Sequence, residues 1–156
     1  MPLVEAISFS AVSFLEDEGG SLPGISDLNS LLKSMEPELR EETYVFCSIP
    51  GKKYSGMNLE PLLMFNEDEG VTIIVEKEIA DDHSLSYSAI WSLITLTVHS
   101  DLTAIGFLAK LTKELADSGI SVNVVSAYYH DHLFVPVEKS KDAMQILKDM
   151  AGTESQ

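Results

Sequence analysis

Hydrophobic residues in the second half of the chain change between strand-like and helix-like spacing. Along residues 93–98 consecutive side chains are expected on opposite faces, whereas the apolar residues of 102–118 recur at helical spacing. Gly119 lies where the backbone can end that helix. The predicted elements are strands at 85–98, 121–128 and 132–137, and helices at 102–118 and from Ser140 or Asp142 onward. This β-α-β-β-α order is most of a ferredoxin-like βαββαβ unit.

The first half repeats this order. Apolar residues at positions 28, 31, 32 and 35 have helical spacing behind a cap at Ser26 or Asp27, and Pro37 ends the helix. The other predicted elements are strands at 43–49 and 71–75 and a short helix at 76–83. The sequence VTIIVEK at 71–77 also resembles LFVPVEK at 133–139, at matching positions of the predicted topology. These observations favour two tandem α/β units.

Neither half supplies a complete six-element unit from its own residues. The first lacks an opening strand unless 4–14 provide one, and the second ends on a helix. The expected fold class is therefore α+β, ferredoxin-like, with two units that share or exchange strands, or with a second chain that completes the sheet. The expected organisation is an N-terminal extension and linker at 1–24, a first unit at 25–91, a second at 92–150 and a tail at 151–156.

The charge of the chain limits its partners. It has 25 acidic and 10 basic residues in 156, a formal net charge of −15, with no basic stripe. Because a phosphate surface attracts clusters of Lys and Arg, we expect neither nucleic acid nor an anionic membrane as partner. The single cysteine, Cys47, is expected as a packed thiol in a strand and fits a reducing compartment, so a cytoplasmic location is predicted.

A cluster of histidines raises the question of a metal. His130 and His132 are two apart, a spacing that places both rings on one face of a strand, and His99 could be a third ligand. The alternative is that His130 and Asp131 form a hairpin turn with local hydrogen bonds. The alternative is favoured, because metal sites usually need three ligands and further residues that orient them.

The sequence contains no motif for nucleophilic catalysis, phosphate binding or dinucleotide binding. Gly106 is expected in the first turn of the helix at 102–118, where glycine costs about 1 kcal/mol relative to alanine. Either close packing of the helix on the sheet or the close approach of a ligand would explain this glycine. Backbone N–H groups at such a helix start can bind a carboxylate.

Several segments together resemble an uncharacterised bacterial family of tandem ACT-domain proteins, and more distantly the ACT modules of eukaryotic arginine sensors. The segments are YVFCSIP at 44–50, NEDEGVT at 66–72, SLITLTVHSDLTAIG at 92–106, GISVN at 119–123 and YYHDHLFVPV at 128–137. The resemblance covers residues 25–150. It implies a module that binds an amino acid or a similar small effector, usually at a domain or subunit interface, and it does not imply an activity. We therefore expect a dimeric regulatory module with no cofactor, no metal and no catalytic residues of its own. An enzyme that it regulates would be a separate chain.

The resemblance also suggests where the ligand binds, because the first strand-to-helix turn of ACT domains commonly contacts it. Asp101 or Asn123 could hold an ammonium group. The candidate ligand-binding residues are His99, Ser100, Asp101, Leu102, Ala104, Gly106, Asn123, Val124, His130 and Asp131. Two other functions stay open: a metal-dependent enzyme that uses His99, His130 and His132, and a protein-interaction module without a small ligand.

Overall fold

The computed structural model describes residues 27–98 and 104–152, so the predicted extension at 1–24 lies outside the described residues. The first unit contains β1 (Pro37–Ile49), α2 (Gly51–Tyr54), β2 (Leu63–Glu67), β3 (Gly70–Glu76) and α3 (Lys77–Asp82), preceded by α1 (Leu28–Ser34). The second contains β4 (Trp91–Leu96), α4 (Phe107–Asp117), β5 (Asn123–Ser126), β6 (Asp131–Pro136), the short 3-10 helix η1 (Val137–Lys139) and α5 (Ser140–Met150).

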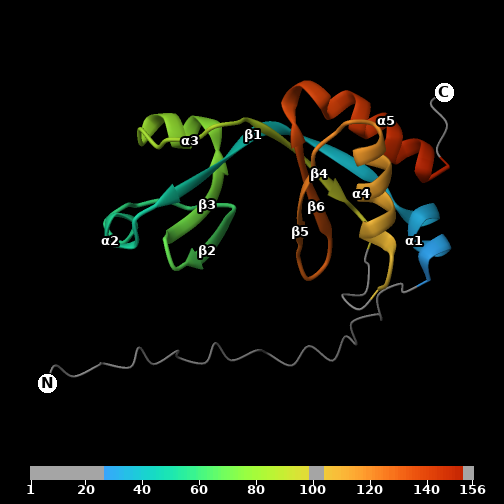
Figure 1. Cartoon of the computed structure of the whole chain (residues 1–156), viewed down its shortest axis with the longest axis horizontal. Coiled ribbons are helices and arrows are strands. Elements are labelled where there is room, and N and C mark those ends of the chain that lie inside the picture. The colour runs from blue at the N-terminus through green and yellow to red at the C-terminus, as the bar shows by residue number, and fades with distance from the viewer. Residues whose placement is uncertain (1–26, 99–103, 153–156) are drawn as a thin grey trace, which may run out of the picture.

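All six strands form one antiparallel sheet in the order β2-β3-β1-β4-β6-β5 (Figure 1). The central pair, β1 and β4, belongs to both units. In the first unit β1-α2-β2-β3-α3-β4 is a complete βαββαβ chain, with β4 as its last strand. The second unit begins at β4 and has no last strand of its own, and β1 takes that position. This confirms the predicted fold class, with the strands shared within one chain.

The 13 residues of β1 divide between its two neighbours. Its first residues pair with β4, from Pro37 opposite Leu96, and its last six residues pair with β3, ending at Ile49 opposite Val71. Between Leu39 and Thr43 the register shifts, because four steps along β1 match only two steps along β4. Two extra residues therefore form a bulge, which bends the strand and increases its twist.

Several predicted boundaries were wrong. The first strand begins at Pro37 rather than at residue 43, because proline tolerates the first position of a strand and the polar run at 38–42 gave no apolar alternation. The strand expected at 85–98 is confined to Trp91–Leu96, since Ser84 turns with a positive φ of 52° and Leu85 packs under α3. In addition, β5 is shorter than expected, β6 begins and ends one residue earlier, and α4 begins at Phe107 rather than at residue 102.

The helices cover one face of the sheet. Around β4 and β6, residues such as Ile94 and Leu133 are fully buried under α1, α4 and α5. Around β1 and β3, a second cluster packs under α2 and α3 and contains Cys47, which is 2% exposed. Each fully buried aliphatic side chain contributes about 1.5–3 kcal/mol to the free energy of unfolding. Burial raises the pKa of the Cys47 thiol, so the prediction of a packed thiol in a strand is confirmed.

The opposite face has a core of its own. Tyr44, Ile74, Leu93 and Phe134 are at most 7% exposed there. Aromatic rings meet edge to face, with centroids 5.3 Å apart for Phe46 and Phe134 and 5.9 Å apart for Tyr44 and Phe134. In the strand order the β2–β3 and β6–β5 pairs are on opposite sides of the central pair, β1 and β4, but in Figure 1 both bend downward from β1. We call this bent surface the concave face.

No helix within the two described ranges is long and apolar enough to cross a membrane.

Candidate functional site

The strand-to-helix turn that was predicted to bind a ligand is described only in part. His99, Ser100, Asp101 and Leu102 lie outside the described residues. Ala104 is half-buried against the core under α4. Gly106 is the N-cap of α4, not a residue of its first turn as predicted. Its φ of 87° lies in the left-handed region that favours glycine, and a Cβ there would meet its nearest atom only at 4.0 Å. The conformation of the turn, rather than close packing, therefore explains this glycine.

The turn between β5 and β6 lies at the end of the sheet where β4 ends. Asp131 pairs with Leu96, the last residue of β4, and is 5% exposed. Its carboxylate accepts a hydrogen bond from the Ser126 hydroxyl at 2.6 Å, and the Ala127 N–H donates to the His130 carbonyl at 3.0 Å. These contacts agree with the predicted hairpin turn held by local hydrogen bonds. Asp131 therefore lies beside the last residue of β4, the strand that precedes Gly106 and α4 in the chain.

The proposed histidine pair does not lie on one strand, because β6 begins at Asp131 and His130 belongs to the turn before it. The Nδ1 atom of His130 is buried and has no hydrogen-bond partner among the described residues. No group of three or more His, Cys, Asp or Glu side chains in the described part of the chain could hold a metal ion. The third predicted ligand, His99, falls outside it.

Asn123 and Val124 lie away from the other candidates. Asn123 is opposite Phe134 and Val124 is opposite Leu133, at the far end of β5 from its turn. Asn123 is three residue steps from Ser126, about 10 Å along the strand. Asn123 is also exposed to solvent. This position counts against a role for its amide in the same ligand site as Gly106.

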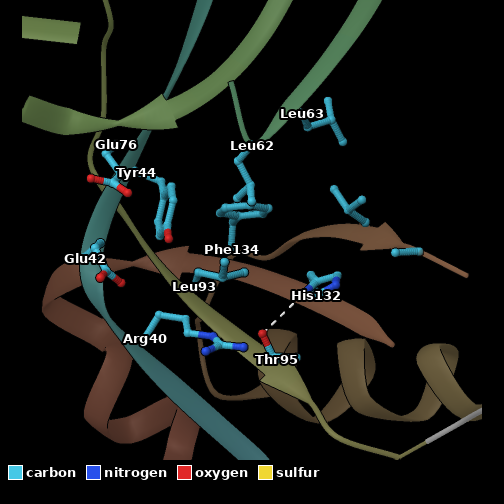
Figure 2. A pocket seen from close by; sticks show the side chains of 12 residues that line it. Arg40, Glu42, Tyr44, Leu62, Leu63, Glu76, Leu93, Thr95, His132 and Phe134 are labelled. Atoms are coloured by element: carbon cyan, nitrogen blue, oxygen red, sulfur yellow. Dashed lines mark hydrogen bonds between the residues drawn. The ribbon is translucent and has the colours of Figure 1, made fainter. Parts of the chain in front are cut away.

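The concave face contains a cavity of about 400 Å³ that the sequence did not predict (Figure 2). That volume lies within the range of about 300–1,000 Å³ that is usual for small-molecule sites. The lining residues come from both units and are Arg40, Glu42, Tyr44, Leu62, Leu63, Glu76, Leu93, Thr95, Val125, Ala127, His132 and Phe134. We call this space the concave cavity.

Charged groups line one part of the concave cavity. Arg40 and Glu42 come from the bulge of β1, and Glu76 is the last residue of β3, opposite Tyr44. Arg40 has a carboxylate of Glu38 at 3.9 Å, and no ion pair in the described part of the chain joins it to Glu42 or Glu76. Burial, together with the charges of Glu42 and Glu76, raises the pKa of the Tyr44 hydroxyl, although Arg40 opposes this.

His132 and Thr95 lie on the other side of the concave cavity (Figure 2). The Nδ1 atom of His132 is 3.2 Å from the Thr95 hydroxyl. Burial, followed by the nearby His130, lowers the pKa of His132; Arg40 acts in the same direction and Asp131 opposes it. The ring is therefore neutral at pH 7, and one nitrogen donates a hydrogen bond while the other accepts. The cavity thus offers an apolar centre, a cation, two carboxylates and a neutral imidazole.

Sequence reasoning missed this site for a specific reason. Arg40, Glu42 and Tyr44 are alternate residues of one strand and share a face. The polar run at 38–42 was not assigned to a strand, so this alternation was not applied to it. Leu62 and Leu63 come from the first unit and His132 from the second, and only the shared sheet brings them together.

The chain matches known families and structures over most of its length. Residues 23–92 match one ACT-domain family, and residues 88–149 match a second ACT-domain family. No match was found to a curated protein. A solved structure from Vibrio cholerae, a protein of unknown function described as a possible transport protein, is 48% identical. The match covers 80% of this chain and 95% of that one, with a TM-score of 0.72.

Two more distant solved structures share the fold. A protein from Agrobacterium tumefaciens is 14% identical, with a TM-score of 0.60 over 75% of this chain and 89% of that one. The regulatory subunit of aspartate kinase from Thermus thermophilus, in its ligand-free form, is 9% identical. Its TM-score is 0.56, over 73% of this chain and 95% of that one.

Proposed function

Because the chain belongs to the family of tandem ACT-domain proteins, we propose that it is a regulatory module that binds an amino acid and has no catalytic activity of its own. The fold it shares with the regulatory subunit of aspartate kinase supports a regulatory role. We further propose a cytoplasmic homodimer that controls a separate enzyme.

The start of α4 is the observation that carries this proposal. Gly106 opens an 11-residue helix with no side-chain cap and no acidic residue in its first turn. The backbone N–H groups of the first turn have no partner within the helix, and the helix dipole makes this end partly positive. Both features suit the carboxylate of an amino acid. The proposed site contains His99, Ser100, Asp101, Leu102, Ala104, Gly106, His130 and Asp131.

A melting screen against the twenty amino acids tests the proposal. An amino acid present at 100 times its Kd is expected to add about 2.7 kcal/mol to the free energy of unfolding, and so to raise the Tm. The variant Ile105→Glu places a negative charge on a side chain that is 89% exposed next to Gly106, and should abolish the shift by repelling the carboxylate.

Ala116→Glu is the matched control, because it adds the same charge to an exposed position at the other end of α4. It should keep the shift. If no amino acid raises the Tm of the unaltered protein, the chain is instead an interaction module without a small ligand.

A further inference from the structure

The concave cavity is lined by none of the residues of the proposed site at the start of α4 and has a distinct chemistry. We propose that it is a binding site for a small zwitterion with an apolar side chain. Its carboxylate would lie at Arg40 and its ammonium group at Glu42 and Glu76. This inference rests on the proposed function only for the class of ligand, an amino acid; its location rests on the cavity alone.

The apolar centre of the cavity consists of buried side chains that pack against one another. Leu93 and Phe134 pair directly across β4 and β6 and are 4% and 1% exposed. The rings of Tyr44 and Phe134 meet edge to face, with their centroids 5.9 Å apart. In Figure 2 these side chains lie between Leu62 and Leu63 on one side and Arg40 on the other. Leu62 is 55% exposed, so an apolar group placed between these walls would bury apolar surface that now faces solvent.

The charges around this centre are held apart rather than neutralised. Arg40 lies at the bulge of β1, where a carboxylate oxygen of Glu38 is 3.9 Å from its guanidinium group. Glu42 and Glu76 lie together on one side of the cavity in Figure 2. Because Arg40 forms no ion pair with either of them within the described residues, a cation and two carboxylates are available to one ligand.

A zwitterion matches this arrangement better than a single charge does. An anion would meet two carboxylates, whereas an amine would offer no carboxylate to Arg40. Planar guanidinium groups bind carboxylates through two parallel hydrogen bonds, and charge-assisted hydrogen bonds are the stronger ones. The bent shape of the face also favours a small ligand over a second copy of the chain, since the walls from β2 and from β5–β6 enclose the space.

Matched ligands and methyl NMR test the proposal on the full chain. The probes are leucine, the amine 3-methylbutylamine, which lacks the carboxylate, and the acid 4-methylpentanoate, which lacks the amine. Phenylalanine, phenethylamine and 3-phenylpropanoate form a second series. At millimolar concentration at least one of the two amino acids should shift the methyl signals of Leu63, Leu93 and Val125 and bind about tenfold or more tightly than its amine and its acid.

Charge variants identify the two ends of the ligand. Arg40→Gln should remove the preference of the amino acid over its amine, and the pair Glu42→Gln and Glu76→Gln should remove its preference over its acid. Glu41→Gln is the control, because Glu41 is an exposed residue of the same strand that does not line the concave cavity, and the preferences should persist.

Three results would overturn the proposal. Methyl shifts confined to Ala104, Ile105 and Leu108, at the start of α4, would leave the proposed function intact and place its ligand there. No cavity shift with either amino acid would reject the cavity site, and the melting screen would then decide separately on the proposed function. Methyl shifts at Leu63 and Leu93 that depend on protein concentration without ligand would mean that a second copy covers this face.

Discussion

At Gly106 the backbone adopts a left-handed conformation that an L-amino acid side chain disfavours. Gly106→Ala is expected to lower the free energy of unfolding by about 1–2 kcal/mol. Gly51→Ala is the matched control, because a Cβ there meets no atom within 4 Å and the glycine has no positive φ. Urea denaturation of both variants measures the difference. Equal stabilities would show that the turn tolerates a side chain.

The sequence could predict the helix after Gly106 but not the start of that helix. The apolar spacing from 104 to 115 fits a helix, and Leu111 and Leu115 are indeed fully buried. A glycine in a helix and a glycine before it satisfy the same pattern, since a glycine adds no side chain to the periodicity. The φ angle of Gly106 shows that this glycine precedes the helix, and the spacing of apolar residues carries no information about that angle.

His132 predicts a pH dependence of stability. Its pKa in the folded protein is below its ordinary value of 6.5. The unfolded chain therefore binds a proton at a higher pH than the folded chain does. As the pH falls through and below 6.5, the unfolded state is favoured and the free energy of unfolding decreases.

Urea unfolding of the protein at several values between pH 7.5 and pH 5.5, about the ordinary titration range of histidine, measures this effect. His132→Gln should make the dependence shallower. His83→Gln, which removes an exposed histidine from the other unit, should retain it. A His132→Gln profile parallel to that of the original protein would contradict the prediction.

Among the elements, β6 is joined to β1 within the core of the concave face by one residue. Phe134 is 1% exposed and contacts both Tyr44 and Phe46 on β1. Phe134→Ala is expected to cost about 3–5 kcal/mol of unfolding free energy, because it removes a large ring and leaves a void. Phe65→Ala changes the same side chain on β2, where it is 64% exposed, and should change the stability by less than about 0.5 kcal/mol. Similar losses in the two variants would mean that the concave face is not packed as described.

The elements differ in how well the sequence predicts them. The helix that begins at Ser140 and the strand order of the second half follow from apolar periodicity, and both are present. The first part of β1 has no such pattern, because residues 38–42 are mostly exposed and polar. Pairing with β4, rather than local preference, holds that segment in the sheet.

At the scale of the whole molecule, both units share the paired strands β1 and β4, and this predicts one cooperative unfolding transition. Trp91 is the single tryptophan and pairs with Tyr44 at the junction of the two units. Its fluorescence and the far-UV circular dichroism of all helices should therefore change at the same urea concentration. Two separate transitions would show that the units unfold independently.

The two-unit organisation was predictable from the repeated order of elements. That the two units share strands β1 and β4 was not. Each half is short of elements when it is considered by itself, and the sequence allows a second chain or the residues before position 25 to supply the missing strand. The antiparallel pairing of β1 with β4 resolves this, but it joins segments about 50 residues apart, beyond the reach of local patterns.

The shared pair also determines whether the gene can be divided. The two family matches overlap at residues 88–92, where β4 begins. The boundary between the two units therefore falls at a strand of the shared sheet and not in a separate linker. A chain cut before Trp91 would yield one fragment that lacks β4 and another that lacks β1. Neither fragment is expected to fold alone, but the two expressed together should reassociate by re-forming this strand pair. Despite its duplicated plan, the protein would then behave in fragment complementation as a single indivisible domain.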